Sequence, residues 1–326
     1  MLEKIQAFID RHQSFILTTH DPADADGLGA ELVFAAILKK RGKACRIING
    51  SEVPVMFRFM DPDGLIEHWD TEKHSDTARQ SAMLVLDTSD EYYTGCMREI
   101  FKQVKEVFTV DHHEPKAHTI LSGFIDPLAA STSELAVDLA MEMGVEFPPQ
   151  VAMAAYTGIV YDTGFFAYSK TTLRTFKAAI KTIESGADTH NVYIQLMESA
   201  TLGALLLQKQ AFSKLEIHSR GRIATMVLSK EDLALCSASY EDAEAFVNMP
   251  LKVREVEVSI IVKETPAGEV RCSLRSKGKV NVSKIAQDFG GGGHTAAAGF
   301  KSKLNLEQTL NKVLSTVTAR LDTGNT

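Results

Sequence analysis

Four short segments in the first half of the sequence carry residue types that bind divalent cations. Three of them follow apolar runs that read as strands, and the fourth lies at the end of a predicted helix. Because ligands in open α/β sheets gather at the carboxyl ends of strands, we expect the segments to converge. Carboxylates and imidazoles without thiolates are typical of Mn²⁺ or Mg²⁺ sites, with Zn²⁺ and Co²⁺ as alternatives. The residues are His20, Asp24, Asp26, Asp87, Asp111, His112, His113 and Asp162.

Each segment taken alone also has a structural explanation. Asp24 or Asp26 could cap a helix, Asp87 could form a turn, and adjacent histidines can be surface residues. Asp162 differs, because a carboxylate at a helix C-terminus is unfavourable unless a positive charge lies nearby. Four such segments together favour a metal site, and they hold more ligands than one catalytic ion uses. The sequence therefore predicts two divalent cations, a pairing that suits hydrolysis of a phosphate ester.

The second half contains a glycine run that ends in a histidine, close to a basic stretch. Residues 270–284 include five Lys or Arg and no acid. A flexible linker and a solvated charged face are the ordinary explanations. The run lies between a predicted helix and a predicted strand, however, where successive backbone N–H groups can bind an anion. We therefore expect a substrate-binding site formed by Arg275, Gly291, Gly292, Gly293 and His294.

Apolar strands alternate with amphipathic helices in the first half. Ser131 and Glu134 have the spacing of a capping box, and Gly42 is placed to end a helix in a left-handed conformation. This alternation predicts an α/β domain with a mostly parallel sheet that is covered on both faces. The predicted strands are 14–18, 43–48, 82–86, 107–110 and 124–125, and the predicted helices are 28–40, 132–143, 150–160 and 171–184.

The second half has a different pattern. A helical stretch at 189–214 leads into strands at 215–218, 222–228, 255–263 and 269–275, with capped helices after Ser229, Asn281 and Asn305. Antiparallel strands interspersed with helices are typical of an α+β domain. We predict a metal-binding catalytic domain at 1–190, a helical connector at 191–214 and a smaller α+β substrate-binding domain at 215–326.

Composition narrows the classes of function. A chain of 326 residues with 44% hydrophobic residues is expected to form two domains with sizeable cores. Its 35 basic and 42 acidic residues give a net charge of −7, which disfavours binding of long nucleic acid. No signal peptide or long apolar run is present, so we expect no membrane association. Four scattered cysteines fit a cytoplasmic protein with reduced thiols. The oligomeric state is open between a monomer and a homodimer.

With Asp111-His112-His113 and the glycine run before His294 both present, the chain resembles the DHH phosphoesterase family. More narrowly, it is similar to the oligoribonuclease and pAp phosphatase branch (the NrnA type). The resemblance covers nearly the whole chain and implies a DHH domain followed by a smaller DHH-associated domain. It also implies two metal ions, with Mn²⁺ expected and Mg²⁺ or Co²⁺ as alternatives. The implied ligands are His20, Asp24 and Asp87 for one ion, and Asp26, Asp87, His112 and Asp162 for the other.

The resemblance also implies roles for residues that do not bind metal. Asp87 and His112 would be catalytic as metal ligands, Asp111 would support the site, and His113 would contact the scissile phosphate. Arg275 and His294 would bind the substrate's other phosphate or the nucleotide body.

The implied function is hydrolysis of short RNAs, from dimers to pentamers, to mononucleotides, and of pAp to AMP. A soluble phosphodiesterase of linear dinucleotides such as pApA or pGpG is the alternative enzyme. A catalytically silent nucleotide sensor is the alternative outside the enzymes, although the intact ligand set argues against it.

Overall fold

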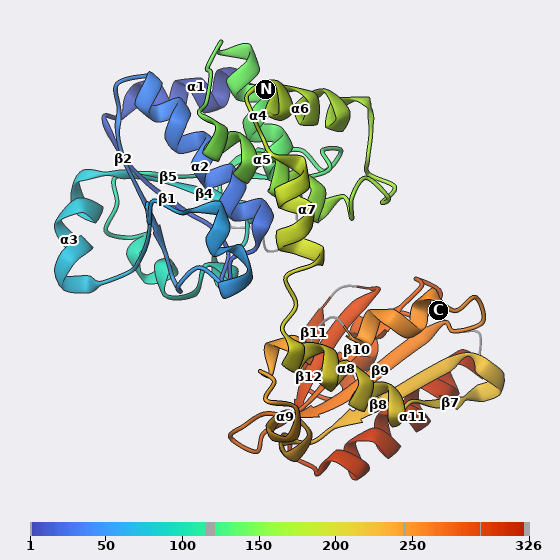
Figure 1. The fold of residues 1–326 in the computed structure, drawn as a ribbon. Coiled ribbons are helices and arrows are strands. Elements are labelled where there is room, and N and C mark those ends of the chain that lie inside the picture. Colours follow the sequence, from blue (N-terminus) through green and yellow to red (C-terminus); the bar gives the residue numbers. More distant parts are fainter. Residues whose placement is uncertain (1, 115–120, 244–245, 294, 323–326) are drawn as a thin grey trace. The chain divides into compact units, whose positions relative to one another are not determined.

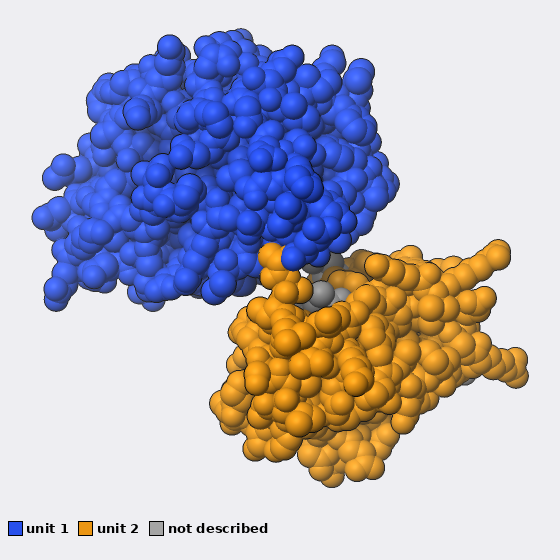
Figure 2. All heavy atoms as spheres, viewed as in Figure 1, with its two compact units in different colours: residues 1–198 blue, residues 199–326 orange. Residues whose placement is uncertain are grey.

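The computed structural model describes residues 2–114, 121–243, 246–293 and 295–322 (Figure 1). The chain forms two compact units (Figure 2). Each unit has its own sheet and hydrophobic core. Unit 1 is Met1–Glu198 and unit 2 is Ser199–Thr326.

Unit 1 is built on a six-stranded sheet in the order β3-β2-β1-β4-β5-β6. Every neighbouring pair of strands is parallel, which confirms the predicted α/β class. All carboxyl ends of the strands therefore lie at one edge of the sheet. The strands are β1 (Ser14–Thr18), β2 (Ala44–Asn49), β3 (Ile66–His68), β4 (Ala82–Leu86), β5 (Val107–Asp111) and β6 (Gly123–Ile125).

Both faces of this sheet are buried, because successive apolar side chains of a strand point to opposite faces. Phe15 and Leu17 of β1 join the large core, whereas Ile16 between them joins a smaller cluster on the other face. The large core includes side chains of α1 (Leu2–Arg11), α2 (Ala25–Lys40), α4 (Thr132–Glu142) and α5 (Pro149–Asp162). The smaller cluster includes side chains of α3 (Thr71–Gln80) and of the 3₁₀ segment η2 (Glu91–Ile100). The helices α6 (Leu173–Glu184) and α7 (Thr189–Met197) complete unit 1.

Small residues let the helices that carry the candidate site pack closely. A Cβ atom at Gly29 of α2 would lie 2.7 Å from Ala154 O of α5 and 2.7 Å from Ser133 Oγ of α4. A Cβ atom at Gly158 of α5 would lie 2.2 Å from the same hydroxyl. These two glycines bring α2 and α5 against the first turn of α4.

Unit 2 has a mixed six-stranded sheet in the order β11-β12-β10-β9-β8-β7, which confirms the predicted α+β class. One face packs against α10 and α11, and the other packs against α8, α9 and the 3₁₀ segment η5 (Phe246–Lys252). The strands are β7 (Glu216–His218), β8 (Ile223–Leu228), β9 (Val258–Glu264), β10 (Val270–Ser276), β11 (Gly292–Gly293) and β12 (Ala297–Ser302). The helices are α8 (Leu202–Ser213), α9 (Lys230–Cys236), α10 (Val282–Asp288) and α11 (Leu306–Asp322).

The connector and one helix cap differ from the sequence prediction. The helical stretch predicted at 189–214 is divided into α7 and α8, and α8 starts anew because Thr201 Oγ1 caps Ala204 N at 3.0 Å. Ser131 caps α4 through Glu134 N, but the Glu134 carboxylate lies beside Arg174 and does not complete a capping box. In the part of the chain that the structure describes, no helix has the length and apolar composition needed to cross a bilayer.

Candidate metal centre

Three overlapping groups of acidic and histidine side chains lie at the carboxyl edge of the unit 1 sheet. Within each group the candidate ligand atoms lie within 4.8 Å of one another. The structure thereby brings together all eight residues predicted in unit 1 except Asp111, which contacts one of the groups through His113. The groups are His20, Asp24 and Asp87; Asp26, His112 and Asp162; and Asp87, His112 and His113.

Asp87 belongs to two of these three groups. It follows β4 directly and adopts a left-handed backbone with φ 63°, which is uncommon for a residue other than glycine. Its two carboxylate oxygens face different histidines, since Oδ2 lies 3.5 Å from His20 Nε2 and Oδ1 lies 3.4 Å from His112 Nε2. The Thr132 hydroxyl donates to Oδ1 at 2.8 Å and fixes the carboxylate. One side chain thus contacts both halves of the cluster.

Asp26 is fixed by the N-terminus of α4. Its carboxylate is fully buried and accepts from Thr132 N at 2.6 Å and from Ser133 N at 2.8 Å. These backbone groups have no partner within the helix, so the first turn of α4 holds the anion. Asp24 caps α2 by accepting from Asp26 N and Gly27 N at 3.0 and 3.2 Å. The capping role considered from the sequence is therefore real for Asp24, and it leaves the Asp24 carboxylate 3.4 Å from His20 Nε2.

His112 is the clearest indication that the cluster fits a cation. Its Nε2 atom is buried and lies 3.0 Å from Asp162 Oδ2, yet it makes no hydrogen bond of good geometry there. Its Nδ1 atom is also buried without a hydrogen-bond partner. A buried ring nitrogen that faces Asp26, Asp87 and Asp162 is arranged as a metal ligand is, and this mixture of oxygen and imidazole donors suits divalent cations.

Repulsion among the carboxylates gives the same indication. Burial raises the pKa of Asp26 well above its usual range, and the charges of Asp87 and Asp162 raise it further. Burial opposes the His20 imidazolium, but Asp24 and Asp87 outweigh it and raise the pKa of His20 to about 11. Without metal, protons must supply the positive charge that the cluster requires. A divalent cation can replace them.

His113 differs from the buried ligands because almost half of its side chain is exposed. Asp111 Oδ1 accepts from both His113 N at 3.0 Å and His113 Nδ1 at 2.8 Å. A carboxylate acceptor requires the proton on Nδ1, so this contact does not involve Nε2. Asp111 thus orients the ring of His113, while His113 Nδ1 lies 3.7 Å from Asp87 Oδ1.

The predicted binding residues of unit 2 that the structure describes lie on or beside two strands of one sheet. The order β11-β12-β10 places the glycine run two strands from Arg275, whose Cα pairs with Ala297. Arg275 is half-buried, and its Nη1 donates to Leu274 O at 3.0 Å. His294 lies outside the described residues. Within the described chain, the predicted basic stretch is partly neutralised, because Glu257 lies beside Lys279 and Glu269 lies beside Arg271.

The glycine run is only partly explained by the fold. Gly290 and Gly293 have positive φ angles of 77° and 143°, and a Cβ atom at Gly291 would lie 2.2 Å from Gly299 O. Gly292 is different, since a Cβ atom there would meet no described atom within 4 Å. Three of the four glycines are thus required by the backbone. The fourth leaves open space on β11.

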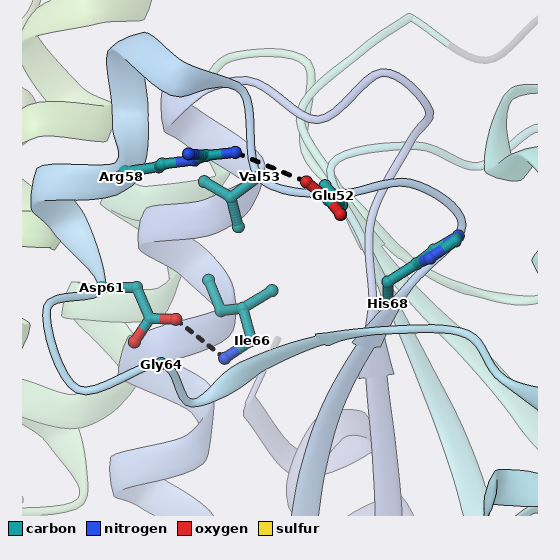
Figure 3. A pocket seen from close by; sticks show the side chains of 7 residues that line it. All are labelled: Glu52, Val53, Arg58, Asp61, Gly64, Ile66 and His68. Carbon is teal, nitrogen blue, oxygen red and sulfur yellow. Dashed lines mark hydrogen bonds and ion pairs between the residues drawn. The ribbon is translucent and has the colours of Figure 1, made fainter.

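A separate pocket of about 410 Å³ is lined by the segment that follows β2 and by β3 (Figure 3). Its polar side chains are largely occupied within the protein, because Arg58 contacts Glu52 and Asp61 accepts from Leu65 N and Ile66 N. His68 Nε2 lies 3.0 Å from Gly50 O. None of the predicted metal ligands lines this pocket, and we assign it no role.

Sequence reasoning missed the residues that hold the ligands in place. Thr132 and Ser133 bind Asp26 and Asp87, and the Lys170 ammonium lies 3.4 Å from His112 O. The helix N-terminus after Ser131 is itself a signal for anion binding and could have indicated Thr132 and Ser133. Nothing in the sequence indicated Lys170.

Family models match both halves of the chain. A model of the DHH family N-terminal domain matches residues 14–159, which contain the cluster except Asp162, and a model of the DHHA1 domain matches residues 234–322. The chain belongs to the DHH phosphoesterase family. This DHH phosphoesterase is accordingly a metal-dependent hydrolase.

Relatives of this phosphoesterase include two proteins that are named for the same pair of activities. A bifunctional oligoribonuclease and PAP phosphatase NrnA of Thermus thermophilus is 28% identical over 311 residues, covering 94% of this chain and 89% of that protein. A probable bifunctional oligoribonuclease and PAP phosphatase NrnA of Streptococcus mutans is 28% identical over 300 residues, covering 91% and 92%. The crystal structure of an exopolyphosphatase-related protein of Bacteroides fragilis has a TM-score of 0.90 at 23% identity, covering 98% and 95%, and shares the fold.

Proposed function

We propose that the chain hydrolyses RNAs of dimer to pentamer length to mononucleotides and removes the 3′-phosphate of pAp. The observation that carries this proposal is the sharing of Asp87 between two groups of ligands, in a chain similar over nearly its whole length to two NrnA proteins. We assign one cation to His20, Asp24 and Asp87, and a second to Asp26, Asp87, His112 and Asp162. Two divalent cations there would polarise a phosphoryl group and activate water for attack, and Mn²⁺ is the metal we propose.

The protein's own residues position the substrate at this cluster. Asp111 holds the His113 ring with Nδ1 3.7 Å from Asp87 Oδ1, so we assign His113 a contact with a phosphoryl oxygen. Arg275 and the glycine run are assigned to a second phosphate or to the nucleotide body. An arginine fork suits a phosphate, and backbone N–H groups near Gly292 have room for one.

Charge supports a preference for short substrates. Phosphates beyond the site would meet a protein of net charge −7, in which Glu257 and Glu269 neutralise part of the basic stretch at 270–284. Long RNA would therefore gain little from additional contacts. The same reasoning disfavours a processive exonuclease, which would have to hold a long RNA during many cycles of hydrolysis.

The proposal is tested by kcat/KM at fixed Mn²⁺ on pAp, pApA, pGpG, an RNA pentamer and an RNA 24-mer. We expect measurable turnover of pAp and the highest kcat/KM on dimers to pentamers, with a fall for the 24-mer. Equal rates on the dimer and the 24-mer would contradict it. Turnover confined to pApA and pGpG would instead support a linear-dinucleotide phosphodiesterase, and no turnover with intact metal binding would support a nucleotide sensor.

A further inference from the structure

Several aromatic rings are exposed around the end of α5, next to the metal-site residue Asp162. The exposed fractions are 39% for Tyr161, 37% for Phe165 and 62% for Tyr168. Large apolar side chains left open to water in a small area are often used for binding. Here they adjoin a cluster to which we have assigned a phosphate-bearing substrate.

The turn that follows Asp162 holds an unusual backbone. Gly164, Phe165 and Phe166 are successive left-handed residues, with φ angles of 54°, 55° and 65°. Bulky side chains rarely adopt this conformation, and such strain is concentrated at functional sites. The turn is fixed by Phe165 N donating to Val160 O at 2.8 Å and Tyr168 N donating to Thr163 O at 2.9 Å. It folds the chain back so that Tyr168 returns to the end of α5.

The ring of Tyr168 rests on the backbone of this turn. A Cβ atom at Gly164 would lie 2.5 Å from Tyr168 Cζ and 2.6 Å from Cε1, so only glycine leaves room for the ring. The ring is therefore supported by the backbone at Gly164, and most of the side chain is open to solvent. A supported, exposed ring is rigid enough to offer a flat surface.

Tyr161 connects this surface to the metal cluster. Its ring packs edge-on against Phe57 at a centroid distance of 5.3 Å. Its hydroxyl lies within electrostatic range of Asp24, Asp162 and Tyr168, and burial together with these groups raises the pKa of Tyr161 to about 12. Tyr161, which directly precedes the metal-site residue Asp162, thus lies near both the metal cluster and Tyr168.

We propose that Tyr161 and Tyr168 form a stacking surface for a nucleobase of the substrate whose scissile phosphate lies at the Asp87 cluster. The ligand class is a single-stranded nucleotide, because an unpaired base presents the flat face that an aromatic ring stacks on. This inference rests on the proposed function and adds a substrate contact within unit 1. Since every base has such a face, stacking gives affinity with little base preference.

The test compares a dinucleotide with an analogue that lacks both bases, for the wild type, Tyr168→Ala and Tyr168→Phe. We expect Tyr168→Ala to raise KM for the dinucleotide about tenfold with a smaller change in kcat. Tyr168→Phe keeps the ring and should behave as the wild type. Neither change should affect the analogue without bases, because it has nothing to stack. Tyr161→Leu, which keeps apolar volume but removes the ring, should reproduce the Tyr168→Ala result.

Controls separate a local binding effect from unfolding. Bound metal and Tm should stay close to the wild-type values in the Tyr168 variants. Leu235→Ala, which removes a 75% exposed apolar side chain from α9 of unit 2, should leave both KM values unchanged. The inference is overturned if Tyr168→Ala leaves KM for the dinucleotide unchanged, or weakens both substrates equally. If the wild type itself does not hydrolyse the dinucleotide, the proposed function fails instead.

Discussion

The carboxylates of Asp26, Asp87 and Asp162 lie around one imidazole, that of His112, in a largely buried part of unit 1. Burial disfavours the charged ring, but Asp162 and Asp87 outweigh it and raise the pKa of His112 to about 10. His20 has its pKa raised to about 11 by Asp24 and Asp87 in the same way. Without metal, both rings therefore carry a proton at neutral pH, and an imidazolium cannot bind a cation.

Metal binding should release protons. Both imidazoles are charged below pH 10 and must lose a proton to become ligands, so the apparent affinity for Mn²⁺ should rise with pH between 6 and 9. Calorimetry at pH 7.5 in buffers of different ionisation enthalpy should count at least two protons released per chain, one from each imidazole. Release of no protons, with an affinity independent of pH, would contradict the assignment of His20 and His112 as ligands.

Glu31 gives a second prediction at the residue scale. It is fully buried on α2, Oε2 accepts from Asn49 Nδ2 at 3.0 Å, and burial raises its pKa from 4.5 to about 8. The folded chain keeps a proton that the unfolded chain loses above pH 4.5, so stability falls as pH rises from 4.5 to 8. Glu31→Gln should remove this loss and gain roughly 2–4 kcal/mol relative to wild type at pH 9. Urea unfolding at pH 5 and pH 9 measures the difference in free energy of unfolding between Glu31→Gln and wild type. An equal difference at both pH values would refute the prediction.

At the scale of elements, the sequence signals were strongest where they were local. β1 and β4 have the bounds predicted from apolar runs that end in polar residues, and Gly42 ends α2 with φ 69° as expected. The strand β3 was missed because it has only three residues and none of them is buried. The helix α3 was missed because only His74 and Ala78 are buried, so it lacks an apolar stripe.

The convergence of the candidate ligands was predictable for a similar reason. Parallel strands carry their carboxyl ends to one edge, so residues after β1, β4 and β5 had to approach one another. The supporting contacts were not predictable in this way. Thr132 Oγ1 reaches Asp87 across 45 positions of sequence, and only the packing of α2, α4 and α5 sets that approach.

The glycine run provides a prediction for a single element, β11. Gly292→Ala should leave Tm nearly unchanged, because its Cβ would enter open space, but it should lower kcat/KM for short RNA if the substrate approaches this backbone. Gly291→Ala is the contrasting variant. Its Cβ would lie 2.4 Å from Phe300 Cβ, so it should cost about 1–3 kcal/mol of stability. Full activity of Gly292→Ala at unchanged KM would remove Gly292 from the binding site.

At the scale of the whole molecule, the two units have separate cores and separate candidate roles. The candidate metal ligands all lie in unit 1, whereas Arg275 and the glycine run lie in unit 2. Substitutions in unit 2 should therefore change substrate affinity without changing metal binding in unit 1. The proposed domain limits of 1–190, 191–214 and 215–326 place the connector across the boundary between the units.

Arg275→Ala tests this separation. Loss of a charge-assisted phosphate contact should lower kcat/KM for short RNA by roughly ten- to a hundredfold, at unchanged metal content. Arg271→Ala is the matched control, since it lies four residues earlier on the same face of β10 and pairs with Glu269. A loss of bound metal in Arg275→Ala would contradict the assignment of this residue to the substrate.

The central claim is that hydrolysis requires divalent cations held by groups of ligands that share Asp87. The most direct measurement is Mn²⁺ content together with dinucleotide hydrolysis for the wild type, Asp87→Asn and the exposed control Asp76→Asn. We expect about two Mn²⁺ per chain in the wild type and the control, and loss of both bound metal and turnover in Asp87→Asn. EDTA should abolish wild-type activity and Mn²⁺ should restore it. Full activity in EDTA after extensive dialysis, or wild-type metal content and turnover in Asp87→Asn, would contradict the claim.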